Sequence, residues 1–222
     1  MSFIVKNTTF PNLLDLLAPH SCRGCGRIGE VLCNRCKNDI IIEHIDHPPN
    51  VKFPKSFPPV YIVSDRTALM NTLIHDFKYN SIRALARPLA EILHQVLPAT
   101  SNSTALVPLP TISYHIRERG LDHTHLIAKH LAKLRHYKVQ KILLRDQDTV
   151  QVGANRQTRL AQATTAYAIN LKVKINPNTT YILLDDVWTT GASMKAAVKK
   201  LRQSGAKNII IALLAVSRLN QD

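Results

Sequence analysis

The stretch TYILLDDVWTTGAS, residues 180–193, decides the fold class. Its apolar run Tyr-Ile-Leu-Leu predicts a buried strand over Thr180–Leu184, and a hydroxyl-rich loop follows. Ala192–Ser204 then has the apolar spacing of a helix, which Gly205 would end. The wholly apolar stretch Asn208–Val216 predicts another buried strand. This strand–loop–helix–strand order indicates a parallel α/β sheet.

The same alternation of apolar strands and helices extends back along the chain to residue 60. Strands are expected over Val60–Val63, Ala105–Leu109 and Val139–Leu144, and helices over Thr67–Tyr79, Ile82–Leu97 and Asp122–His136. Pro88 inside the second of these helix patterns predicts a kink or a helix start near that point. Residues 151–168 are polar and partly helical in pattern. We therefore expect a mostly parallel sheet with helices on both faces over residues 60–222.

The N-terminal part of the chain holds all four cysteines. Cys22, Cys25, Cys33 and Cys36 form two Cys-x-x-Cys pairs, which is typical of one tetrahedral zinc ion held by four thiolates. Such a site leaves no position for water, so the zinc would be structural. The alternatives are two local disulfides or four unrelated thiols. Disulfides suit an exported chain, whereas the start MSFIVKNTTF lacks the apolar core of an export signal.

The division of the chain follows from these patterns. Residues 1–45 are expected to hold a short helix, Asn12–Leu17, and the zinc ribbon. Residues 46–59 are rich in proline and indicate an extended linker or an irregular cover. Residues 60–222 form the α/β domain.

The composition favours an anionic partner. The 222 residues include 29 Lys and Arg against 15 Asp and Glu, a formal net charge of +14. A field of that sign attracts nucleic acids, nucleotides and polyphosphates, although a basic surface can also serve solubility alone. Aromatic residues are only 5%, which makes an aromatic platform for single strands a poor fit. No apolar run approaches the ~18–20 residues of a membrane helix, so we expect a cytoplasmic protein without membrane insertion.

The residues after the strand at 180–184 carry the expected chemistry. Ligands of α/β sheets bind outside the carboxyl ends of the strands. Asp185 and Asp186 can accept hydrogen bonds from two vicinal hydroxyls, as a ribose offers. The loop Thr189–Ser193 lies at a helix N-terminus, where free N–H groups and hydroxyls can surround a phosphate. The alternative is that this loop is an ordinary helix cap.

ILLDDVWTTGAS resembles the phosphoribosylpyrophosphate signature of type I phosphoribosyltransferases. With the four-cysteine finger before it, the chain resembles the competence protein F (ComF) family, proteins associated with DNA transformation that join a zinc finger to a phosphoribosyltransferase domain. The resemblance covers nearly the whole chain. Other stretches that match in order are LLDLLAPHSCRGCG, HDFKYNSIRALARPLA, LVPLP with RERGLDHT, and QVGANRQTR. The sequence departs from the family at Leu121, Asp122 and His123, where Phe-Asn-Gln is frequent, and also at Gln162 and Tyr167.

The resemblance implies roles for particular residues. Asp185 and Asp186 would be the catalytic pair that holds the ribose hydroxyls of phosphoribosylpyrophosphate. The residues implied to bind its 5′-phosphate are Thr189, Thr190, Gly191, Ala192 and Ser193. Those implied to face the pyrophosphate, with a magnesium ion shared with the ligand, are Val107, Pro108, Leu109 and Pro110. Arg117 and Arg119 are candidates for the pyrophosphate charge, or else a solvated basic turn.

Three functions fit these observations. The first is an enzyme that transfers a phosphoribosyl group to an unidentified acceptor. The second is a non-catalytic competence protein that holds single-stranded DNA on its basic surface and uses the pocket as a ligand sensor. The third is a regulatory relative that binds phosphoribosylpyrophosphate and a protein partner of the competence machinery.

Overall fold

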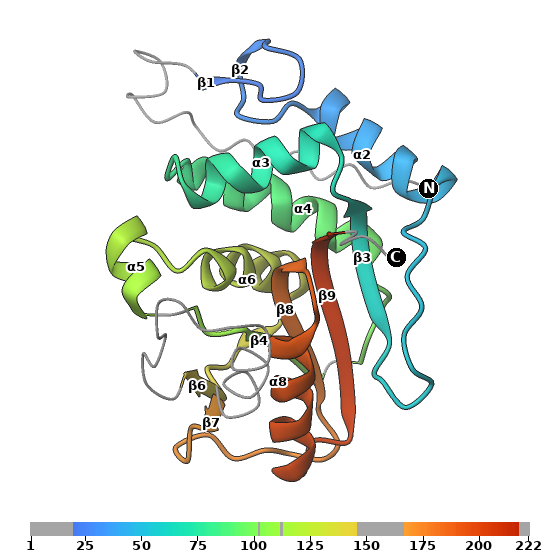
Figure 1. Cartoon of the computed structure of the whole chain (residues 1–222), viewed down its shortest axis with the longest axis vertical. Helices are drawn as coiled ribbons and strands as arrows, with labels where there is room; N and C mark the ends of the chain where they lie inside the picture. Colours follow the sequence, from blue (N-terminus) through green and yellow to red (C-terminus); the bar gives the residue numbers. More distant parts are fainter. Residues whose placement is uncertain (1–19, 102, 112, 146–166, 218–222) are drawn as a thin grey trace.

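The computed structural model describes residues 20–101, 103–111, 113–145 and 167–217, and a parallel sheet lies at its centre (Figure 1). The strand order is β3-β9-β8-β4-β5, and every neighbouring pair is parallel. The bounds are β3 Val60–Asp65, β4 Thr104–Pro108, β5 Lys138–Val139, β8 Thr180–Trp188 and β9 Asn208–Val216. The parallel α/β sheet predicted from the sequence is therefore confirmed.

Helices cover both faces of this sheet. On one face lie α3 (Ala68–Lys78), α4 (Ala86–Val96) and α6 (His123–Arg135), and on the other lies α8 (Ala192–Gln203). Alternate side chains of β8 point to opposite faces, so Ile182 and Leu184 join the core with α4 and α6. Tyr181 and Leu183 join the second core, with α8. Burial on both faces explains why the strand is apolar at consecutive positions.

The N-terminal residues pack directly on this domain. A short antiparallel pair, β1 (His20–Ser21) and β2 (Ile28–Gly29), precedes helix α2 (Asn34–Asp46). This helix was not expected, and its first turn carries Cys36. Cys22, Leu32 and Ile40 share a buried cluster with side chains of α3 and α4. The cysteine-bearing segment and the sheet domain therefore share one hydrophobic core.

The proline-rich segment 46–59 covers part of the second core. Phe53 and Phe57 meet the ring of Trp188 edge-on, with centroids 5.0 and 5.7 Å apart. Of the two alternatives drawn from the sequence, an irregular cover describes this segment.

The expected strand Val139–Leu144 is wrong, because it is two strands in different sheets. The N–H of Gln140 still bonds to the carbonyl of Leu106, 2.9 Å away, at the edge of the main sheet. The chain then leaves this sheet, and β6 (Leu143–Arg145) pairs antiparallel with β7 (Tyr167–Ile169) in a separate two-stranded sheet. Gln140 and Lys141 interrupt the apolar residues of this stretch at the point where the chain leaves the main sheet, a signal that the prediction of one strand passed over.

Helix α4 begins near Pro88, after a short 3-10 turn, η1 (Arg83–Leu85). Proline stands in the first turn, where backbone N–H groups have no helical acceptor, so no hydrogen bond is lost. A further short helix, α5 (Ser113–Arg119), was not expected. The expectations for Asn12–Leu17 and for residues 151–166 lie outside the described residues. None of the described helices is both long and apolar enough to cross a membrane.

Candidate functional site

The topology of the sheet identifies one edge as the place for a ligand. From β4 the chain passes through α6 to β5, moving outward on one side. From β8 it passes through α8 to β9, moving outward on the other side and across the opposite face. A crevice opens outside the carboxyl ends of strands where the winding reverses in this way. In this chain that point lies between the ends of β4 and β8.

A cavity of about 250 Å³ occupies this point. The polar and charged residues among those that line it are Lys78, Thr111, His123, Thr124, Arg145, Tyr167, Asp185, Asp186 and Ser193. They come from segments far apart in the sequence. The cavity therefore gathers acids, cations and hydroxyls at the edge that the topology selects.

The two acids lie in the last part of β8 rather than after it. The neighbouring strand β4 pairs with β8 only as far as Leu184, so Asp185 and Asp186 extend beyond it. Strand alternation sends the two carboxylates to opposite faces, and yet both line the cavity. Asp186 is buried and its Oδ2 lies 2.7 Å from Nζ of Lys78. The N–H of Asp186 donates to Oδ1 of Asp185 over 2.9 Å.

The environment of Asp185 perturbs its acidity. Burial and the adjacent charge of Asp186 raise the pKa of Asp185 to about 7. The N–H of Asp186 and the cations Lys78 and Arg145 act in the opposite direction without offsetting that rise. A carboxyl group that titrates near neutral pH inside a polar cleft is typical of a functional site.

The loop before α8 forms a second, smaller hollow. It has a volume of about 60 Å³ and is lined by Thr189–Ser193 together with Asp185 and Trp188. One water needs roughly 10–15 Å³ by this kind of measure, so a larger group such as an anion has room. Asp185 and Ser193 line both hollows, so the two lie side by side at these residues.

Gly191 is required by the shape of this loop. Its φ is +71°, in the left-handed region, and it precedes the first residue of α8. A Cβ at this position would lie 2.1 Å from Cζ2 of Trp188. The alternative of an ordinary cap is observed only in part, because the N–H of Ala192 reaches Oγ1 of Thr190 over a long 3.4 Å. The first N–H groups of the helix have no acceptor within the helix, which suits an anion.

Two cations that sequence reasoning did not assign to the site also line the cavity. They are Lys78, at the end of α3, and Arg145, whose guanidinium lies 5.7 Å from the ring centroid of Tyr167. Tyr167 is buried, and burial, reinforced by the charge of Asp185, raises the pKa of its phenol. Lys78 belongs to a stretch that matched the family, but only the packing of α3 against the end of β8 reveals that it meets Asp186.

The residues expected on the pyrophosphate side are placed unequally. Val107 and Pro108 lie within β4 and are buried, whereas Leu109 lines the cavity. The N–H of Leu109 donates to the carbonyl of Leu184 over 2.9 Å, and prolines have no N–H. Pro108, Leu109 and Pro110 therefore have no backbone N–H available to a pyrophosphate. Arg117 is exposed on α5 and is not among the residues that line the cavity. The side chain of Arg119 and the stretch QVGANRQTR lie outside what the structure describes.

The four cysteine sulfurs form one cluster. All four Sγ atoms lie within 4.8 Å of one another, and those of Cys25 and Cys33 are 3.7 Å apart. A tetrahedron with Zn–S bonds of about 2.3 Å needs sulfur separations of about 3.8 Å. Position 24 has no room for a side chain, because a Cβ there would lie 2.6 Å from Sγ of Cys36, and glycine has none. The cluster is therefore positioned to bind one metal ion and is consistent with structural zinc.

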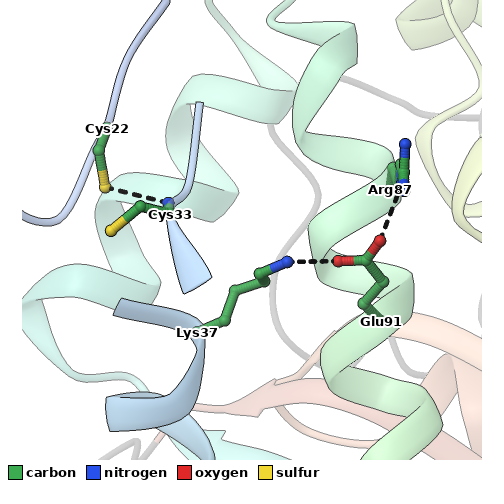
Figure 2. A network of polar contacts seen from close by, with 5 residues as sticks. All are labelled: Cys22, Cys33, Lys37, Arg87 and Glu91. Carbon is green, nitrogen blue, oxygen red and sulfur yellow. Dashed lines mark hydrogen bonds and ion pairs between the residues drawn. The ribbon is translucent and has the colours of Figure 1, made fainter. Parts of the chain in front are cut away.

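Backbone donors favour the thiolate form of Cys22, whereas burial and the neighbouring sulfur atoms raise the pKa of Cys36. Burial alone would raise the pKa of Cys22, but N–H groups of Cys33, Cys25 and Gly24 lower it to about 6. The N–H of Cys33 lies 3.3 Å from Sγ of Cys22 (Figure 2). Thiolate is the form that binds zinc, so these donors favour metal binding at Cys22, and a bound cation would have to draw the proton from Cys36.

Comparison with known proteins agrees with this geometry. Residues 129–220 match the family model described as uracil phosphoribosyltransferase. The matched segment runs from within α6 to beyond the end of β9. It includes Asp185, Asp186 and the loop Thr189–Ser193. The sheet, the cavity at its carboxyl edge and this match define a phosphoribosyltransferase-like domain.

The resemblance extends into the cysteine-bearing segment. Over 201 residues the chain is 25% identical to Competence protein F of Haemophilus influenzae, covering 85% of this chain and 86% of that protein. Together with the four-cysteine cluster, this similarity confirms the resemblance to competence protein F inferred from the sequence.

Proposed function

We propose that this chain binds phosphoribosylpyrophosphate with Mg²⁺ at the carboxyl edge of its sheet and transfers the phosphoribosyl group to an acceptor. The observation that carries the proposal is the adjacency of the two hollows. An anion-sized hollow at the N-terminus of α8 shares Asp185 and Ser193 with a larger cavity that is also lined by cations. A sugar that carries phosphate at one end and pyrophosphate at the other matches that order of groups.

Each part of the ligand has a complementary group. Thr189–Ser193 would bind the 5′-phosphate through N–H groups and hydroxyls. Asp185 and Asp186 would accept hydrogen bonds from the ribose hydroxyls. Lys78 and Arg145 line the remaining space and would meet the pyrophosphate. Two carboxylates beside phosphate oxygens are a ligand set that Mg²⁺ takes, and the bound ion would offset charge on the departing pyrophosphate.

The reaction would be a displacement at the anomeric carbon. The bond from this carbon to the pyrophosphate oxygen breaks, and its electron pair leaves with pyrophosphate while a bond to the acceptor forms. No side chain needs to act as a nucleophile. The chain's own residues would hold the two reactants in line and stabilise the charge that develops on the leaving group.

Trp188 offers a direct test, because it is the single tryptophan of the chain and it contacts the loop at Gly191. Titration with phosphoribosylpyrophosphate and Mg²⁺ should change its fluorescence saturably, and pyrophosphate release with a panel of bases should follow. The double substitution Asp185→Asn/Asp186→Asn should abolish both signals. Asp39→Asn, at an exposed acid of α2, is the matched control and should retain them. Absence of saturable binding by the wild-type protein would contradict the proposal.

A second candidate is a competence protein that holds single-stranded DNA and uses the cavity as a sensor. The net charge of +14 and the similarity to Competence protein F support it. DNA affinity should then fall steeply with salt and survive the double substitution at 185 and 186. Neutralising exposed lysines such as Lys133, Lys138 and Lys141 should weaken it. If DNA binding and ligand binding both fail, neither function stands.

A further inference from the structure

The last turn of α3 contacts three parts of the molecule through three consecutive residues. Oδ2 of Asp76 lies 3.0 Å from Nε of Arg23, which belongs to the first cysteine pair. The ring of Phe77 meets that of His123 edge-on, with centroids 4.8 Å apart. Nζ of Lys78 lies 2.7 Å from Oδ2 of Asp186, at the ligand cavity. One helical turn therefore connects the cysteine-bearing segment with the carboxyl edge of the sheet.

The contact at the cysteine side joins an exposed cation, Arg23, to a buried acid, Asp76. Asp76 is only 7% exposed, and a buried carboxylate is costly without a cation or hydrogen bonds. Besides Arg23, it accepts a hydrogen bond from Nδ2 of Asn80 over 2.6 Å, and Nδ1 of His75 lies 3.9 Å away. Removing Arg23 takes away the guanidinium that pairs with this acid. We therefore expect the last turn of α3 to shift.

Arg23 is in turn held by the fold of the cysteine segment. Its backbone N–H donates to the carbonyl of Val31 over 3.0 Å. It stands between Cys22 and Gly24, and a Cβ at Gly24 would lie 3.6 Å from Cδ1 of Leu69 in α3. The first cysteine pair therefore sits directly on this helix. A metal ion on the four sulfurs would fix the backbone that presents the guanidinium.

We propose that Asp76 is a positioning residue, through which the folded cysteine cluster, by way of Arg23, keeps Lys78 on Asp186 and so maintains the ligand site. The inference rests on the proposed function for the identity of the ligand. Its consequence is that damage to the cysteine side weakens ligand binding without any change in a residue that lines the cavity.

A matched pair of substitutions tests this link. Lys37 and Arg23 are both cations of the cysteine-bearing segment that bond to an acid of the sheet domain. Nζ of Lys37 lies 2.6 Å from Oε2 of Glu91 in α4 (Figure 2). The partner of Arg23, Asp76, lies two residues from Lys78, whereas the partner of Lys37 lies in another helix. Lys37→Gln therefore controls for a general loosening between the two parts.

Arg23→Gln should retain full zinc content and weaken binding of phosphoribosylpyrophosphate with Mg²⁺ by about three- to tenfold. Lys37→Gln should change it by less than about twofold. Arg23→Lys, which keeps the cation, should restore part of the affinity. The measurements are metal analysis and fluorescence titration of Trp188.

A second readout needs no ligand. The ionisable groups around Asp185 are Asp186, Lys78, Arg145 and Tyr167, and His123 lines the same cavity. Displacing Lys78 removes a positive charge that lowers the pKa of Asp185, so the carboxyl carbon signal of Asp185 should titrate at higher pH in Arg23→Gln, as measured by NMR. Lys37→Gln should leave this titration unchanged.

The outcomes separate the two proposals. If the wild-type protein fails to bind phosphoribosylpyrophosphate, the proposed function fails, while the carboxyl titration still tests the link. If Arg23→Gln behaves as wild type in both readouts, or if Lys37→Gln shows equal losses, the link is overturned. Should Arg23→Gln not fold, Asp76→Asn keeps the shape of the side chain, and the same two results decide.

Discussion

The cysteine cluster and the carboxyl edge of the sheet are both built from clustered polar groups, but they are assembled differently. The cluster draws four identical ligands from one short segment, and all four sulfurs lie within 4.8 Å of one another. The edge draws its acids, cations and hydroxyls from α3, α6, β6, β7, β8 and α8 around an open cavity. The first is closed and local and suits a structural ion. The second depends on the whole fold and suits a ligand that enters and leaves.

The largest expected effect is on the cysteine side. Cys36→Ser should lose the metal and strongly destabilise residues 20–46, because structural zinc contributes about 10–16 kcal/mol in small zinc-binding peptides. Circular dichroism melts with and without a chelator, together with hydrogen exchange, measure the loss. A melting temperature insensitive to both the substitution and the chelator would show that this cluster does not carry a structural metal.

Gly191→Ala should have the next largest effect, and it should fall on the carboxyl edge. A left-handed alanine costs about 1–2 kcal/mol, and its Cβ would also meet Trp188 at 2.1 Å. Affinity for phosphoribosylpyrophosphate should fall more than tenfold, as titration would measure.

Gly205→Ala is the matched control for this prediction. Its φ is +98°, but a Cβ there meets nothing within 4 Å. It should therefore lose stability through backbone strain while ligand affinity stays near wild type. Equal loss of affinity in both variants would mean that the loop at Gly191 has no special role.

Asp185→Asn should change the stability of the protein in a way that depends on pH. The pKa of Asp185 is about 7 in the folded protein and near its ordinary value of 3.8 when the chain is unfolded. Between these values the folded state binds more protons, so this residue lowers stability as pH rises. The variant should therefore be more stable than wild type at pH 8, by about 1–2 kcal/mol after allowing for solvent screening, with no gain at pH 4.

Thermal melts across this pH range measure the effect of Asp185→Asn. Asp186→Asn is the contrast, because it removes the carboxylate that Lys78 contacts and should destabilise the protein at pH 8. A gain for Asp185→Asn that does not change with pH would contradict the raised pKa of Asp185.

The smallest expected effect concerns the proline-rich cover. Phe57→Leu removes one edge-on contact to Trp188, and such aromatic contacts contribute about 0.5–1.5 kcal/mol. The melting temperature should fall slightly and the tryptophan emission should shift. Ligand affinity should change little, because Phe53 still packs against the same ring. A large loss of affinity would make this cover part of the ligand site.

The sequence predicted the local features of both regions well. The predicted strand Asn208–Val216 has the same bounds as β9, and the helix predicted after Gly191 ends within one residue of α8. Both could be predicted because the burial of β9 and the amphipathic pattern of α8 depend on residues that are close together in the sequence. The spacing of the cysteines likewise revealed their cluster. These features depend on chain neighbours and on the periodicity of strands and helices.

What the sequence could not predict depends on contacts between distant segments. Lys78 meets Asp186, and Arg145 meets Tyr167, only because of how helices and strands pack. Val139–Leu144 was assigned to one strand although Gln140 and Lys141 interrupt its apolar residues, because only the pairing of β6 with β7 shows that the chain changes sheets there. Arg117 was a reasonable candidate by charge, yet α5 carries it on the exposed surface.

The central claim is tested most directly by a crystal structure determined after soaking with phosphoribosylpyrophosphate and Mg²⁺. The account predicts the 5′-phosphate in the hollow formed by Thr189–Ser193 and the ribose hydroxyls at Asp185 and Asp186. Ligand density elsewhere on the protein, or an unchanged cavity at a saturating concentration, would contradict it.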